Sequence, residues 1–121
     1  MIDPRSSVPL YEQLEQNIIA LISAGALAPD DQLPSVRSLA RELGINPNTV
    51  QKAYAHLEER GIIYQAAGRG SFVSPVGQAM DRIAQEKRAA LAASVREAAR
   101  AGVSREEVLA LVQSLYEEET V

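Results

Sequence analysis

The chain has 121 residues, with 16 acidic and 12 basic side chains and a formal net charge of −4 at pH 7. Cysteine is absent and there is one histidine, which excludes disulfides and thiol catalysis and argues against a zinc site of the usual nitrogen and sulfur ligands. No apolar run approaches the roughly 18 residues that cross a bilayer, and no secretory signal is visible, so we expect a cytoplasmic protein with no membrane association.

The first half of the chain predicts three helices. Residues 9–24 form the first, ended by Gly25, and residues 27–34 read as a loop. A second helix, residues 35–43, begins at the N-cap Ser35 and ends at Gly44. A third, residues 47–60, begins after the N-cap Asn46 and stops at Gly61. Each helix has a predicted buried stripe of apolar residues. The stripes are, for the first helix, Leu10, Leu14, Ile18, Leu21 and Ile22; for the second, Val36, Leu39, Ala40 and Leu43; and for the third, Val50, Ala53, Tyr54 and Leu57.

A short hairpin is predicted after the third helix. Residues 62–65 and 71–73 have strand character, residues 66–70 form a glycine-containing tip, and Pro75 closes the unit. Three helices followed by a hairpin make a winged helix-turn-helix. The predicted fold class is therefore mainly α with a small β-hairpin, and residues 1–75 are expected to form a DNA-binding domain.

Residues 76–121 are expected to form a helical hairpin used for dimerisation. Residues 78–101 read as one long helix ended by Gly102, and Ser104 opens a last helix with a capping box that reaches Glu107. A two-helix unit of this size cannot bury both of its apolar stripes alone. The stripes need either the first domain or a second copy of the chain, and we favour a second copy, hence a homodimer.

Charge is unevenly distributed along the sequence. Residues 32–75 carry five basic and three acidic side chains, a net charge of +2, which leaves −6 for the rest of the chain. The positive charge thus lies in the predicted winged helix-turn-helix, and the acidity elsewhere would repel DNA and help to fix orientation. For any single residue, ordinary solvated surface is the simpler interpretation.

Several ordered motifs carry a resemblance to a known family. They are LPSVRSLA at residues 33–40, GINPNTVQKAY at 44–54, LEERGI at 57–62, the opening PLYEQL at 9–14 and the wing GRGSFV at 68–73. Together they closely resemble the GntR family of bacterial transcription regulators over residues 8–74, and the short two-helix tail is similar to the YtrA-type subfamily. The resemblance implies a homodimeric regulator, usually a repressor, which in this subfamily often controls genes for ABC transporters.

Candidate DNA-binding residues cluster at the start of the third helix and at the wing. Small polar groups at the N-terminal end of a helix, together with free backbone N–H groups, suit contacts with phosphates and base edges. A cation between two glycines at a hairpin tip suits a phosphate or the minor groove. The second helix contributes an arginine in its first turn, where the helix dipole disfavours a cation and where the family contacts DNA. The predicted set is Ser35, Arg37, Asn46, Asn48, Thr49, Gln51, Lys52, Gly68, Arg69 and Gly70.

Each of these residues also has a purely structural interpretation. Asn46 could serve only as a helix cap, Lys52 could be ordinary helix surface, and the wing glycines could provide turn geometry alone. Tyr11 and Tyr54 fall near buried stripes and are expected at the edge of the core, and His56 is most simply a surface residue.

The predicted mechanism places the two third helices of a dimer in successive major grooves of an inverted-repeat operator. The alternative is a winged-helix adaptor that binds protein instead of DNA. Catalysis is not expected, because no nucleophile–base pair or phosphate-binding loop is visible, and no cofactor is expected. A small-molecule effector is left open, lodged between the tail helices and the winged helix or at the dimer seam.

Overall fold

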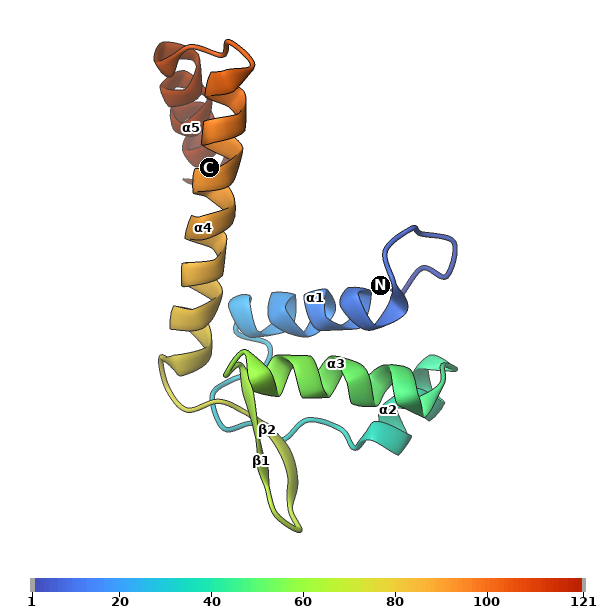
Figure 1. Ribbon diagram of the computed structural model, residues 1–121. Helices are drawn as coiled ribbons and strands as arrows, with labels where there is room; N and C mark the ends of the chain where they lie inside the picture. The colour runs from blue at the N-terminus through green and yellow to red at the C-terminus, as the bar shows by residue number, and fades with distance from the viewer. Residues whose placement is uncertain (1, 121) are drawn as a thin grey trace. The chain divides into compact units, whose positions relative to one another are not determined.

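A computed structural model describes residues 2–120 (Figure 1). In chain order, the elements are α1 (Leu10–Ser23), α2 (Val36–Leu43), α3 (Pro47–Glu59), β1 (Ile63–Ala66), β2 (Gly70–Val73), α4 (Gln78–Arg100) and α5 (Arg105–Thr120). This order confirms the predicted winged helix-turn-helix followed by two helices, and each predicted element boundary holds to within two residues.

The chain divides into two compact units, of which the first extends to Ala84 and the second begins at Gln85. The dividing point therefore lies inside α4, because Ala79 and Ile83 are buried in the core of the first unit. The functional division between residues 75 and 76 stays a prediction.

The core of the first unit is built from one face of each helix. The predicted stripe of α3 is buried completely. Helix α1 buries Leu14, Ile18 and Ile22, but Leu21 is 45% exposed, so its predicted place in the stripe is wrong. Successive helical residues point about 100° apart, and Ile22 already occupies the inward direction. The buried apolar set is Leu14, Ile18, Ile22, Leu33, Ala40, Val50, Ala53, Tyr54, Leu57, Ile62, Ile63, Val73, Ala79 and Ile83.

One polar residue of α1 is buried for a reason that no apolar pattern reveals. The Gln13 side chain accepts a 2.6 Å hydrogen bond from the Asp3 N–H and donates to the carbonyl oxygens of Asp3 and Val8 at 2.9 and 2.8 Å. These bonds satisfy its amide and fasten residues 3–8 against the start of α1.

The wing is an antiparallel hairpin that pairs Ile63 with Val73 and Ala66 with Gly70. It is also tied to the loop that precedes α2. The Leu33 N–H donates to the Ser71 carbonyl at 2.8 Å, and the Val73 N–H donates to the Asp31 carbonyl at 2.9 Å. The wing is thereby fixed to the helical part of the first unit along β2.

The second unit has no buried side chain between Gln85 and Glu119. Helix α5 begins as predicted, because the Ser104 hydroxyl accepts a 3.1 Å hydrogen bond from the Glu107 N–H. Among the described helices, none combines the length and apolar character of a membrane span. The exposed large apolar side chains of this unit are Leu91, Val95, Val103, Leu109, Leu111, Val112, Leu115 and Tyr116.

Candidate nucleic-acid interface

Helix α3 presents a polar face because its apolar stripe is turned inward. Asn46, Asn48, Gln51 and Lys52 are exposed, and Thr49 is half-buried. Asn48, Thr49 and Lys52 come together with Leu10 and Tyr11 of α1 around an open hollow of about 420 Å³. Three of the predicted residues of this helix therefore line one hollow at the surface.

The first turn of α3 corrects one part of the sequence interpretation. We expected free backbone N–H groups there, but the Asn46 Oδ1 atom accepts the Asn48 N–H at 2.8 Å. The Thr49 N–H donates to the Asn46 carbonyl at 3.0 Å, and Pro47 has no N–H. Because these donors are already used inside the helix start, recognition at this end depends on side chains.

Lys52 lies over an aromatic ring instead of beside a carboxylate. Its Nζ atom is 4.1 Å from the centre of the Tyr11 ring, within the range of a cation–π interaction. Among the described residues, no carboxylate forms an ion pair with Lys52. Its charge is therefore not neutralised by another side chain. Tyr11 is half-buried at the core edge, as predicted, and desolvation, followed by Glu12 and Glu15, raises its pKa.

His56 is not the simple surface residue that the sequence suggested. Its ring meets the Tyr11 ring edge to face, with centroids 5.1 Å apart and an interplanar angle of 88°. Its Nδ1 atom lies 3.4 Å from Oε2 of Glu15, which is 6% exposed. Arg60 donates from Nη1 to the other Glu15 oxygen at 3.1 Å. The buried carboxylate thus lies between nitrogen groups of α3 and of its C-cap residue, which offsets its desolvation.

Tyr54 is a core residue, as predicted. Its hydroxyl donates a 2.7 Å hydrogen bond to the carbonyl of Pro34. Burial raises the pKa of Tyr54 to about 12, because the phenolate would be charged in an apolar surrounding. The bond joins α3 to the segment that leads into α2.

Helix α2 presents Arg37 from its first turn, exposed to solvent. Ser35 caps this helix: its hydroxyl accepts from the Ser38 N–H at 3.1 Å and donates to the Ser38 hydroxyl at 2.9 Å. Gly44 ends the helix with a φ of 67°, which is the left-handed conformation expected of a terminal glycine.

The wing tip presents Arg69 between two glycines with positive φ, 74° at Gly68 and 115° at Gly70. The guanidinium carbon lies 5.7 Å from the centre of the Phe72 ring. On the same hairpin, Tyr64 stacks on Phe72 and donates from its hydroxyl to Asp30 at 2.9 Å, a hydrogen bond that raises the pKa of Tyr64. The arginine is therefore an exposed cation on a braced hairpin.

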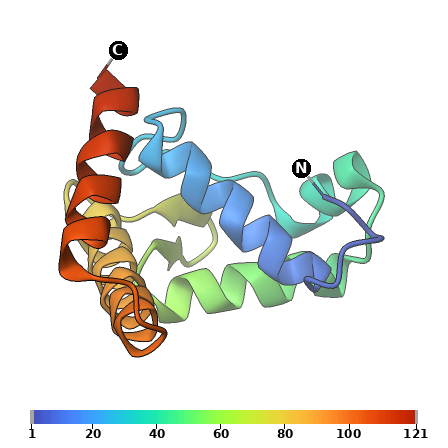
Figure 2. The ribbon, with the colours of Figure 1, turned by 90° about the horizontal axis from the view of Figure 1, so that it is seen from above.

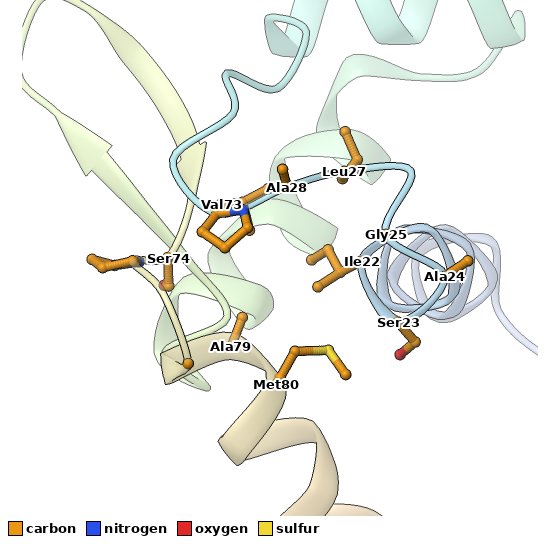
Figure 3. Close-up of a pocket in the computed structure, with 13 residues that line it drawn as sticks. Ile22, Ser23, Ala24, Gly25, Leu27, Ala28, Val73, Ser74, Ala79 and Met80 are labelled. Atoms are coloured by element: carbon orange, nitrogen blue, oxygen red, sulfur yellow. The ribbon is translucent and has the colours of Figure 1, made fainter.

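A second hollow, of about 380 Å³, lies on another part of the first unit. Its lining side chains come from the end of α1, the loop after it, the end of β2 and the first turn of α4 (Figure 3). They include Ile22, Leu27, Val73 and Met80, and none of the lining residues is ionisable. Such a lining suits a small apolar molecule better than a charged one.

The tri-helical unit with its capped α3, polar outer face and cationic wing defines a DNA-binding protein of the winged helix-turn-helix class. The family profile for bacterial regulatory proteins of the gntR family matches residues 10–73. The chain belongs to the GntR family and is a DNA-binding regulator of transcription.

Individual relatives agree with this assignment. The HTH-type transcriptional repressor YtrA of Bacillus subtilis (strain 168) is 53% identical over 73 residues, which cover 60% of this chain and 56% of YtrA. A GntR family transcriptional regulator from Listeria monocytogenes has a similar structure, with a TM-score of 0.78, 32% identity and coverage of 90% of this chain and 96% of that one. The predicted GntR membership of the YtrA type is confirmed.

A further solved structure is that of AraR(DBD) in complex with operator ORX1. It matches 61% of this chain and 92% of the AraR chain, with a TM-score of 0.55 and 30% identity.

Proposed function

We propose that this chain is a transcriptional repressor that binds an inverted-repeat operator as a homodimer. The exposed polar face of α3, together with a wing that carries an exposed arginine, is the observation that supports DNA readout most directly. Two relatives add support, since YtrA is named a repressor and the AraR domain is solved with an operator.

The proposed contacts follow from the donors that each element presents. Asn48, Gln51 and the amide NH₂ of Asn46 can reach base edges from the major groove, and Thr49 and Lys52 can bind phosphates. Arg37 of α2 and Arg69 of the wing tip add two exposed cations from outside α3. Ser35, Gly68 and Gly70 shape the backbone that presents these two arginines. An adaptor that binds protein would more often show apolar or aromatic groups on this face of α3.

Dimerisation is proposed for the second unit because its apolar side chains have no cover of their own. No described side chain from Gln85 onward is buried, although Leu109, Leu111 and Leu115 follow one another along α5. A two-fold pair of these helical hairpins would remove that apolar surface from water. It would also make the second operator half-site effectively intramolecular.

The test is to incubate the purified protein with fragmented DNA from its own genome and to sequence the retained fragments. We expect a recurrent inverted repeat whose half-sites are centred about one helical turn apart, roughly 10 base pairs. Retention of random fragments, or of none, contradicts sequence-specific readout and favours the adaptor.

A reporter placed behind the recovered sequence tests the sign of regulation. Expression of the chain should lower transcription from that promoter, and an increase would contradict repression. Sedimentation of the protein with a duplex that carries the repeat should give two chains per duplex.

A further inference from the structure

Tyr11 connects the DNA-facing lysine of α3 to a buried charge. From the surface inward, Lys52 lies 4.1 Å from the Tyr11 ring centre, Tyr11 meets His56 edge to face at 5.1 Å, and His56 lies 3.4 Å from Glu15. Each contact passes from one helix to the other. The last residue, Glu15, is buried and is held a second time by Arg60.

Helical spacing accounts for this arrangement. Tyr11 and Glu15 are four residues apart on α1. Lys52 and His56 on α3 and Arg60 at its C-cap follow at intervals of four. Residues at this spacing lie on one helix face. The two helices run in the same direction, and they come close near their N-terminal ends (Figures 1 and 2). The contacts given above show that the two rows interleave.

We propose that Tyr11 is a positioning residue for DNA binding: its ring holds the Lys52 ammonium toward the phosphate backbone. The inference rests on the proposed function, since it takes Lys52 to be a DNA contact. A free lysine side chain has many rotamers and loses that freedom when it binds. A ring face restricts the ammonium without consuming its charge, whereas a carboxylate partner would neutralise it.

The ring, and not the hydroxyl, performs this task. The Tyr11 hydroxyl donates to the exposed Glu12 carboxylate at 3.3 Å, whereas the Lys52 ammonium lies over the ring. Tyr11→Phe keeps the ring face and its edge contact with His56, whereas Tyr11→Leu keeps apolar bulk and removes both. This pair of variants separates positioning from simple packing.

The experiment is a double-mutant cycle on a 30-base-pair duplex that carries the repeat recovered above, with Kd measured by fluorescence anisotropy. Tyr11→Leu should weaken binding by about 2- to 5-fold, the range of an exposed cation–π contact. Tyr11→Phe should bind as the parent chain does. In a Lys52→Ala background, Tyr11→Leu should have no further effect.

The outcomes separate the two proposals. If Lys52→Ala binds as tightly as the parent chain, Lys52 is not a DNA contact and the positioning role is overturned. The proposed function fails separately, when the parent chain retains no recurrent inverted repeat. If Lys52→Ala weakens binding but Tyr11→Leu costs the same factor with and without Lys52, the positioning role alone is overturned.

A measurement on the free, unmodified protein guards against a Tyr11→Leu chain that does not fold. The Lys52 ε-methylene protons should resonate upfield of those of Lys87, the other lysine, because of the Tyr11 ring current. Tyr11→Phe should keep that difference. Equal shifts for the two lysines in the parent chain would overturn the inference.

Discussion

The side-chain amide of Gln32 donates a 2.8 Å hydrogen bond to the carbonyl oxygen of Arg69, 37 residues further along the chain. The bond joins the loop before α2 to the tip of the wing. The amide can lie this close because the neighbouring Gly70 has no side chain: a Cβ atom there would be 3.0 Å from Gln32 Nε2. The backbone that presents the wing cation is therefore fixed from outside the hairpin.

Gly70→Ala should lower the free energy of unfolding by about 2 kcal/mol, because a side chain is strained at a φ of 115° and would press on the Gln32 amide. Gly68→Ala is the matched control, since its φ is 74° and nothing lies within 4 Å of its Cβ position. It should cost about 1 kcal/mol. Urea unfolding measures the free energy of both variants. If Gly70→Ala loses no more than Gly68→Ala does, the close contact between Gly70 and the Gln32 amide does not stabilise the wing.

Lys52→Ala and Arg69→Ala should each weaken operator binding and reduce its dependence on salt. Every lost phosphate contact lowers the slope of log K against log salt concentration by about 0.9. Lys87→Ala, which removes an exposed lysine from α4, is the control and should leave the slope unchanged. A uniform decrease in all three variants would indicate long-range attraction instead of contacts at these two residues.

Tyr54 should make stability depend on pH in the alkaline range. Its pKa is about 12 in the folded chain and 10.0 for a free tyrosine, so the folded state keeps a proton that the unfolded state loses. Its contribution is complete below pH 10 and is lost as the pH rises through 12. Tyr54→Phe should lose less stability over this pH range. A pH titration followed by absorbance at 295 nm should show one fewer tyrosine that ionises near pH 12. If stability depends on alkaline pH in the same way in Tyr54→Phe and in the parent chain, the contribution assigned to Tyr54 is wrong.

Leu111→Asp should dissociate the proposed dimer, because it places a charge on the exposed apolar surface of α5. Operator affinity should then fall by about 100-fold, as expected when two linked sites become independent. Ser114→Asp introduces the same side chain at another exposed position of the helix and should remain dimeric. Sedimentation equilibrium distinguishes the two, and a dimeric Leu111→Asp chain would place the interface elsewhere.

The helices could be predicted because their signals are local. Asn46, Pro47 and Gly61 mark the limits of α3, and its buried stripe follows from spacing alone. The same asparagine also determines which backbone groups are available, because an asparagine that caps a helix occupies one of the N–H groups at the helix start.

The cluster around Glu15 could not be predicted from local pattern. Glu15 and Arg60 are 45 residues apart, and their pairing depends on how α1 and α3 approach each other. The sequence offers one indication: Glu15 directly follows the buried Leu14, and His56 and Arg60 are four residues apart. The bond from Gln32 to Arg69 depends on tertiary approach in the same way.

The first turns of α4 affect how the DNA-binding part could be isolated. Ala79 and Ile83, which are 3% and 5% exposed, complete a core that otherwise ends at β2. Loss of one buried isoleucine side chain costs about 2–5 kcal/mol, a large share of the stability of a small domain. Truncation after Pro75 should therefore yield an unstable fragment, whereas a fragment that continues through Ala84 keeps the two side chains that complete its core.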